Sequence, residues 1–125
     1  MKLKKVKCAK CGRIVSRSED SFNKIARILE IDPQDLEKVY LCKDCRQYAC
    51  IGWLDISRVV NLEDDNFIEK YKNRLRWYHI SRYRELAPTF IIKHIDKISD
   101  HIFKNPIFET LPDTVKLLLR TKFGR

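Results

Sequence analysis

A Cys-x-x-Cys motif occurs twice in this chain, as Cys8-Ala9-Lys10-Cys11 and as Cys42-Lys43-Asp44-Cys45. The two-residue spacing turns both sulfurs of a pair toward one point, and two pairs supply the four thiolates of a closed tetrahedral site. We therefore predict a structural Zn²⁺ site on Cys8, Cys11, Cys42 and Cys45. The alternative is a set of reduced thiols in the core or a redox motif, because redox proteins also use a single Cys-x-x-Cys.

Residues 12–41 separate the two pairs, which is more than the about 15–20 residues of the commonest double-pair pattern. We expect a helical insertion at 16–40. The pattern Ser16-x-x-Glu19 is a capping box that predicts a helix to about Glu30, and Asp32-Pro33 predicts the start of a second, shorter helix. Two helices joined by a tight turn can bind in a DNA groove, but acidic residues are concentrated in this turn and in the second helix. We therefore expect the two helices to pack over the zinc site.

The residues around the cysteines predict a small β knuckle and a following helix. The stretch from Val6 to Val15 is typical of strand, loop and strand, with Gly12 supplying a positive φ in the loop. A helix is expected to start at or just after Cys45, with an inward stripe at Ala49, Trp53, Ile56 and Val60. Its N-terminus would stabilise the anionic sulfurs.

This order of parts resembles a treble-clef zinc finger. The fragments Cys8-x2-Cys11-Gly12 and Tyr40-Leu41-Cys42-x2-Cys45 are similar to the zinc-binding domain of the ClpX unfoldases. The resemblance covers residues 6–60 and implies the fold and the four ligands. It implies no function, because the spacer is longer and helical and nothing downstream looks like an ATPase.

The expected fold class is mostly α with a small zinc-bound β knuckle. Residues 1–62 would form a treble-clef-like zinc module, and residues 63–125 a basic part of three helices that shares one core with it. The acidic connector at 61–65 marks the boundary, and Asp64 or Asp65 is expected to cap the next helix. Pro88-Thr89 and Pro112-Asp113 would open the last two helices, the first of which ends before Asn105.

The formal net charge of +9 is unevenly distributed along the chain. Residues 1–18 carry seven lysines and arginines and no acidic residue, and residues 66–125 also have a basic excess. Residues 19–65 are acidic overall. A basic excess at both ends predicts an anionic partner.

Residues 66–86 are expected to form one helix whose apolar stripe opposes a face of cations and large rings. Cations beside aromatic rings favour nucleic-acid contact, because cations meet phosphates while rings stack on bases. The alternative is that another helix of the protein covers Trp77 and Tyr83. The predicted nucleic-acid contacts are Lys70, Lys72, Arg74, Arg76, Trp77, Tyr83 and Arg84.

We therefore predict a nucleic-acid-binding protein of transcription, replication, RNA handling or a mobile element, with weak sequence preference. The alternative is a protein-interaction adaptor or small subunit of a larger complex. We expect no enzyme and no small-molecule substrate, because no Gly-rich loop or nucleophile–base pair stands out and a four-cysteine site lacks an open position. No catalytic role is expected for His79, His94 or His101.

Compartment is also predicted from the cysteines and from the N-terminus. Four cysteines assigned to metal leave Cys50, which we expect to be a small buried hydrophobe. No apolar region follows the N-terminal lysines, and no apolar run is long enough to span a bilayer. We expect a cytoplasmic protein with no membrane partner.

Overall fold

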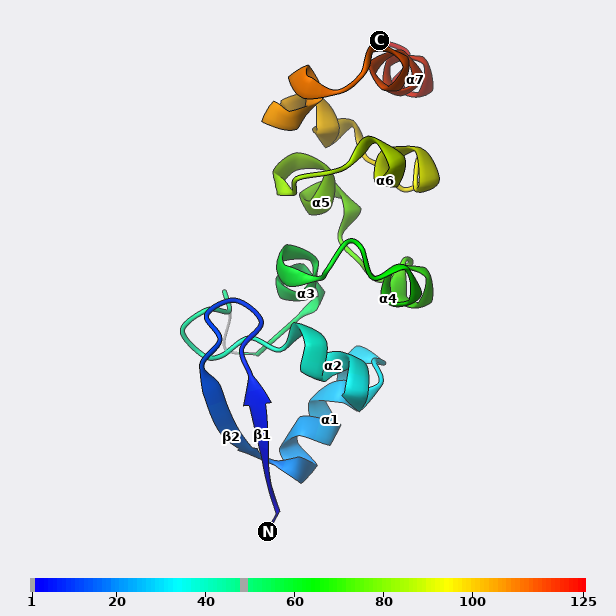
Figure 1. The fold of residues 1–125 in the computed structure, drawn as a ribbon. Coiled ribbons are helices and arrows are strands. Elements are labelled where there is room, and N and C mark those ends of the chain that lie inside the picture. Colours follow the sequence, from blue (N-terminus) through cyan, green and yellow to red (C-terminus); the bar gives the residue numbers. More distant parts are fainter. Residues whose placement is uncertain (1, 48–49) are drawn as a thin grey trace. The chain divides into compact units, whose positions relative to one another are not determined.

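The computed structural model describes residues 2–47 and 50–125, which are mostly helical with one two-stranded sheet (Figure 1). The predicted mostly helical fold with a small β knuckle is confirmed at this level. The chain forms two compact units, Met1–Leu75 and Arg76–Arg125. No helix in the described part of the chain is long and apolar enough to cross a bilayer.

The first unit opens with a hairpin of two antiparallel strands, β1 (Leu3–Lys7) and β2 (Ile14–Ser18). Because successive side chains of a strand point to opposite faces, Val6 is buried while its neighbours Lys5 and Lys7 are exposed. The predicted order of strand, cysteine loop and strand is confirmed.

Helix α1 (Glu19–Leu29) follows β2 directly. Its N-cap is Ser18, whose hydroxyl accepts the Ser21 N–H at 3.0 Å. The prediction of a cap at Ser16 was wrong, because strand pairing continues to Ser18 and Ser16 lies within the ladder. The helix ends, as predicted, near Glu30, which adopts a left-handed conformation with φ 56°.

Helix α2 (Pro33–Val39) begins after Asp32, as predicted. The Asp32 carboxylate makes no cap hydrogen bond, because it accepts from the Lys70 ammonium at 2.8 Å instead. Lys70 belongs to α4 (Asp65–Tyr71) and also donates to Asp35 at 2.9 Å. The two helices are therefore joined by charged hydrogen bonds at the start of α2.

Tyr71 completes this contact between α4 and α2. Its hydroxyl donates to the Asp35 carboxylate at 2.6 Å and accepts the Asp32 N–H at 3.0 Å. Its ring packs on the Trp53 ring, with centroids 5.5 Å apart. Burial alone would raise the pKa of Asp35, but hydrogen bonds from Tyr71 and Lys70 lower it.

Helix α3 (Trp53–Val59) begins later than predicted. The expected helix at Cys45 is absent, because residues 43–47 form turns and bends. Gly52 is a poor helix former, and its N–H donates at 3.3 Å to the carboxylate of Asp55 in the first turn of α3. The inward positions predicted on this helix are buried at Trp53, Ile56 and Val60, whereas Ala49 lies outside the described residues.

The prediction of one helix over 66–86 was wrong. This stretch forms two short helices, α4 and α5 (Trp77–Tyr83), separated by the turn residues 72–76. On one continuous helix, Tyr71 and Ile80 would point in opposite directions. The break allows both to be buried, Tyr71 in the first unit and Ile80 in the second. Burial of apolar surface thus outweighs the few hydrogen bonds of the missing turns.

The second unit contains α5 and four further helical segments (Figure 1). These are α6 (Pro88–Lys93), the 3-10 helices η1 (Asp100–Lys104) and η2 (Pro106–Thr110), and α7 (Asp113–Phe123). The predicted starts at Pro88 and at Asp113 are confirmed, but the helix expected to run almost to Asn105 is broken. It ends at Lys93, with His94 as its C-cap, and residues 94–97 form turns. The Ser99 N–H then donates to the Ser81 hydroxyl at 2.9 Å, and the Ser99 hydroxyl caps η1.

Candidate metal centre

Cys8 and Cys11 lie in the loop that joins β1 to β2. The Cys8 N–H donates to the Arg13 carbonyl at 2.8 Å, and the Gly12 N–H donates to the Cys8 carbonyl at 3.0 Å. Gly12 has φ +79°, a conformation that residues with a Cβ rarely adopt. The predicted role of Gly12 in turning this loop is confirmed.

Cys42 and Cys45 lie in a turn shortly after α2. The Cys42 carbonyl accepts the N–H groups of Cys45 and Arg46, each at 3.1 Å, which closes the turn. The Tyr40 carbonyl accepts the N–H of Ala9 at 2.7 Å and so joins the second cysteine pair to the hairpin loop. The backbone hydrogen bond between Ala9 and Tyr40 therefore holds the two cysteine loops side by side.

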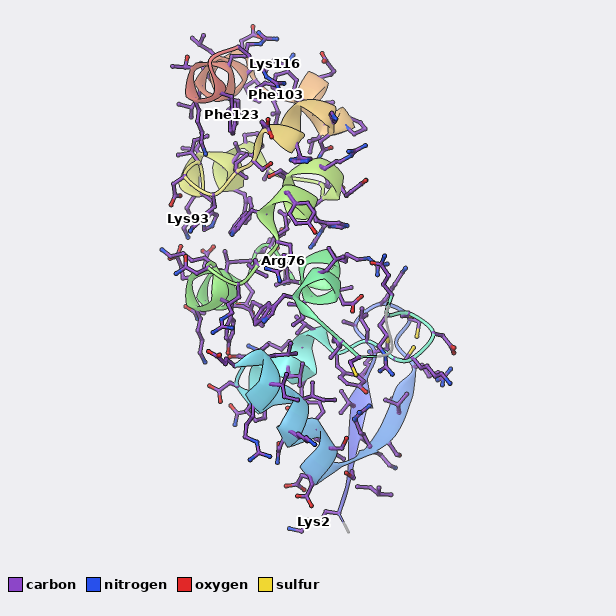
Figure 2. The ribbon with its side chains drawn as sticks, turned by 180° about the vertical axis from the view of Figure 1, so that it is seen from behind. Lys2, Arg76, Lys93, Phe103, Lys116 and Phe123 are labelled. Carbon is purple, nitrogen blue, oxygen red and sulfur yellow. The ribbon has the colours of Figure 1, made fainter. Side chains whose placement is uncertain are left out.

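The four predicted ligands Cys8, Cys11, Cys42 and Cys45 form one cluster, with sulfur atoms that all lie within 4.8 Å of one another. Figure 2 shows sulfur atoms in yellow beside the hairpin loop. The Sγ atoms of Cys11 and Cys42 are 3.7 Å apart, far beyond a disulfide bond. Tetrahedral coordination with Zn–S bonds of about 2.3 Å would separate the sulfurs by about 3.8 Å. The cluster could therefore hold one metal ion.

The four thiols differ in burial and in acidity. Cys8 and Cys42 are buried, Cys45 is half-buried and Cys11 is exposed. Burial alone would raise the pKa of Cys8, but backbone N–H groups of the cysteine loops lower it to about 6. The hydrogen bond with Cys42, burial and the neighbouring thiols raise the pKa of Cys45 to about 12. A divalent cation would supply the positive charge needed to ionise the whole set.

An ion pair spans the two cysteine loops at the surface. The Arg13 guanidinium lies 2.9 Å from the carboxylate of Asp44, and both side chains are exposed. The hydrogen bond with Asp44, its charge and the nearby sulfurs raise the pKa of Arg13. Sequence analysis did not single out Asp44, although its position between Cys42 and Cys45 places it opposite the other loop.

Cys50 is not part of the cluster. It is exposed, so the prediction of a buried position was wrong. It lies shortly before α3, which begins at Trp53.

Three of the predicted nucleic-acid contacts are cations of the first unit, and each lies beside a carboxylate. Lys70 pairs with two aspartates at the start of α2, the N-cap Asp32 and Asp35. Lys72 lies 3.4 Å from Glu69, and Arg74 pairs with Glu30. Much of their charge is therefore balanced within the protein.

The other four predicted contacts belong to the second unit. Trp77 is buried, and its ring centroid lies 6.0 Å from that of Phe90, so the protein itself covers this ring. Tyr83 is 64% exposed. Arg76 is exposed, whereas Arg84 is half-buried and burial lowers its pKa. Within this set, the structure therefore leaves Tyr83 and not Trp77 as a ring at the surface.

The histidines make packing and hydrogen-bonding contacts in the second unit. His94 is buried, with its ring centroid 4.6 Å from that of Phe90. The His101 Nδ1 atom lies 2.7 Å from the Ser99 hydroxyl, and the His79 ring packs on Tyr83.

The chain matches no protein-family model, no curated protein and no solved structure with which it was compared. Function is therefore inferred from the cysteine cluster, from the exposed side chains and from the distribution of charge.

Proposed function

We propose that this chain is a zinc-stabilised protein that binds nucleic acid mainly through phosphate contacts and with weak sequence preference. The observation that carries the proposal is the N-terminal segment 2–18, which contains seven basic and no acidic side chains and folds as a hairpin around two of the clustered cysteines. A cationic surface of this kind attracts a polyanion.

Zinc is the metal that this donor set favours. Four thiolates at tetrahedral spacing are typical of a structural Zn²⁺ site, in which the coordination is closed and the metal does no catalysis. A β knuckle followed by a second cysteine pair supports a treble-clef-like module with a helical insertion, although α3 begins well after Cys45. A small unit buries little apolar surface, and a metal adds the stability that its core lacks.

Phosphate contact has a direct experimental signature. Each phosphate neutralised by a lysine or arginine releases counterions, so the logarithm of the association constant falls with the logarithm of salt concentration. We expect a slope of about −0.7 to −0.9 for each phosphate neutralised. Fluorescence anisotropy with labelled single-stranded DNA, single-stranded RNA and duplex DNA, between about 50 and 200 mM salt, measures this slope. Failure to bind any of the three at the lowest salt would contradict the proposal.

A second candidate function is protein interaction, and one observation in the second unit favours it. A hollow of about 440 Å³ is lined by Tyr83, Glu85, Pro106, Ile107 and their neighbours. It combines an exposed ring with aliphatic and polar groups, as peptide-binding surfaces do. If the protein binds no oligonucleotide at low salt, a role as a protein-interaction adaptor becomes the better proposal.

A further inference from the structure

The outer face of the hairpin carries lysines in a regular pattern. The register sets Lys5 opposite Ser16 and Lys7 opposite Ile14, and all four side chains are exposed. Alternate residues of a strand share one face, so Lys5 and Lys7 lie on the same face about 7 Å apart. Lys2, labelled in Figure 2, lies just before β1 at the end of the hairpin far from the cysteine loop.

Side-chain contacts divide the seven cations of segment 2–18 into two groups, of which the first holds two ion-paired cations and one cation bound to a neutral hydroxyl. Lys4 pairs with Glu37 at 3.1 Å, Arg13 pairs with Asp44, and Arg17 donates to the Tyr40 hydroxyl at 3.0 Å. The remaining four make no ion pair with any residue that the structure describes, and all are exposed: Lys2, Lys5, Lys7 and Lys10.

Two of these lysines also line a hollow. A cavity of about 540 Å³ beside the cysteine loop is bordered by Lys7, Lys10, Lys38 and Asn61. Glu37 also borders it, but its carboxylate is paired with Lys4. Cys8, Cys11 and Gly12 also line the hollow, so it adjoins the candidate metal centre, and its volume is in the range of sites that hold small ligands.

From these observations we infer that the outer face of the hairpin and the adjoining hollow are the surface that binds the phosphodiester backbone of a nucleic acid. The inference rests on the proposed function and adds the place of contact. Lys5 and Lys7 on the strand face contact successive phosphates. Lys7 and Lys10 contact the phosphates of the nucleic acid that lie nearest the hollow. Lys5, Lys7 and Lys10 themselves pair with no described carboxylate, in contrast to the cations at 70–74.

The apolar side chains on this face do not fit a membrane surface. Leu3 and Ile14 are exposed, but they lie at opposite ends of the register, because Leu3 pairs with Ser18 and Ile14 with Lys7. Insertion at a lipid surface needs a continuous apolar face. Phosphate contact needs only the spaced lysines.

A double substitution tests the inference in the full-length, zinc-loaded chain. Lys5→Ala together with Lys7→Ala should weaken binding of labelled oligonucleotide on the order of 10- to 100-fold at about 100 mM salt and flatten the log–log slope by about 1.4 to 1.8. The matched control is Lys24→Ala with Lys104→Ala, which removes the same charge from exposed lysines elsewhere and should change affinity less than about twofold. Lys5→Arg with Lys7→Arg keeps the charge and should keep binding.

The outcomes separate the inference from the proposed function. Tight, salt-dependent binding that is equal in K5A/K7A and in the control would overturn the inference and leave the proposed function standing. No binding by the unaltered chain would overturn both. Binding of phosphatidylserine vesicles but not of oligonucleotides, lost in K5A/K7A, would assign this face to a lipid surface and also overturn the inference. Zinc content and circular dichroism verify that each variant is folded.

Discussion

Asp35 shows how a single carboxylate joins segments that are far apart in the sequence. It is half-buried, and it accepts hydrogen bonds from Tyr71 and Lys70 of α4 while Lys38 lies 3.6 Å away on its own helix. Hydrogen bonds to the charged form outweigh the cost of burial and lower its pKa. The carboxylate is therefore a stabilising anion at neutral pH.

Replacing Tyr71 by Phe tests this contact, because the ring remains and only the hydroxyl is lost. We expect Tyr71→Phe to lower the free energy of unfolding by about 1–3 kcal/mol, the usual effect of losing a hydrogen bond to a charged group. Tyr78→Phe, at a ring that is 48% exposed, is the control and should change stability by less than about 0.5 kcal/mol. Equal stability of the Tyr71→Phe variant and the unaltered chain would contradict the contact.

The pH dependence of this effect follows from the direction of the shift. A carboxylate with a lowered pKa stabilises the fold fully above its unfolded value of about 3.9, and the stabilisation is lost as pH falls through the folded value. Burial and the bond to Asp35 raise the pKa of Tyr71, so its hydroxyl does not ionise near neutrality. Urea unfolding between about pH 5.5 and 8 should therefore show a constant difference for Tyr71→Phe.

At the scale of elements, the break between α4 and α5 decides what Trp77 does. The sequence pattern placed Trp77 among cations and left open whether the ring is covered. The structure buries it against Phe90 and His94. Trp77 is thus a core residue of the second unit, while Tyr83 on the same helix remains exposed.

Truncating each ring separates these roles. Trp77→Ala should lower the free energy of unfolding of the second unit by about 3–5 kcal/mol, because it leaves a large cavity. Tyr83→Ala should cost less than about 1 kcal/mol, because it removes a side chain at the surface. Thermal unfolding followed by far-ultraviolet circular dichroism measures both. Unfolding of the Trp77→Ala and Tyr83→Ala variants at the same temperature would contradict the burial of Trp77.

Elements with local signals were predictable from the sequence. Asp32-Pro33 and Pro112-Asp113 mark helix starts through proline geometry, and Gly12 marks the cysteine loop through its positive φ. The breaks in the helices expected at 66–86 and 89–104 were not predictable, because they depend on contacts with other elements. In the second stretch, α6 ends at Lys93, and the Ser99 N–H donates to the Ser81 hydroxyl of α5, a contact that no local pattern reveals.

At the scale of the whole molecule, the net charge of each segment was predictable from the sequence. The distribution of unpaired charge over the surface was not. The basic segments at both ends are evident from the sequence. Which cations are balanced depends on distant partners, as when Lys70 meets Asp32 and Arg74 meets Glu30. The nucleic-acid contact proposed for residues 70–84 stays a prediction. In the hairpin, Lys5 and Lys7 make no ion pair with any described residue, and we propose that face as the contact surface instead.

The metal centre was predictable because four cysteines at fixed spacing allow few arrangements, and the predicted cluster is confirmed. The cluster lies between the hairpin loop and the turn after α2, so a bound metal would connect these two segments of the first unit. Structural zinc contributes roughly 10–16 kcal/mol of apparent binding free energy, much of it folding free energy. Loss of one ligand should therefore release the metal and unfold the first unit.

The zinc content of purified chains, measured beside two cysteine variants, tests this centre most directly. We predict one zinc per chain for the unaltered protein and for Cys50→Ser, whose thiol is exposed and outside the cluster. We predict loss of zinc from Cys42→Ser, whose thiol is buried within it. Full retention of zinc by Cys42→Ser, or the absence of zinc from the unaltered chain, would contradict the four-cysteine site.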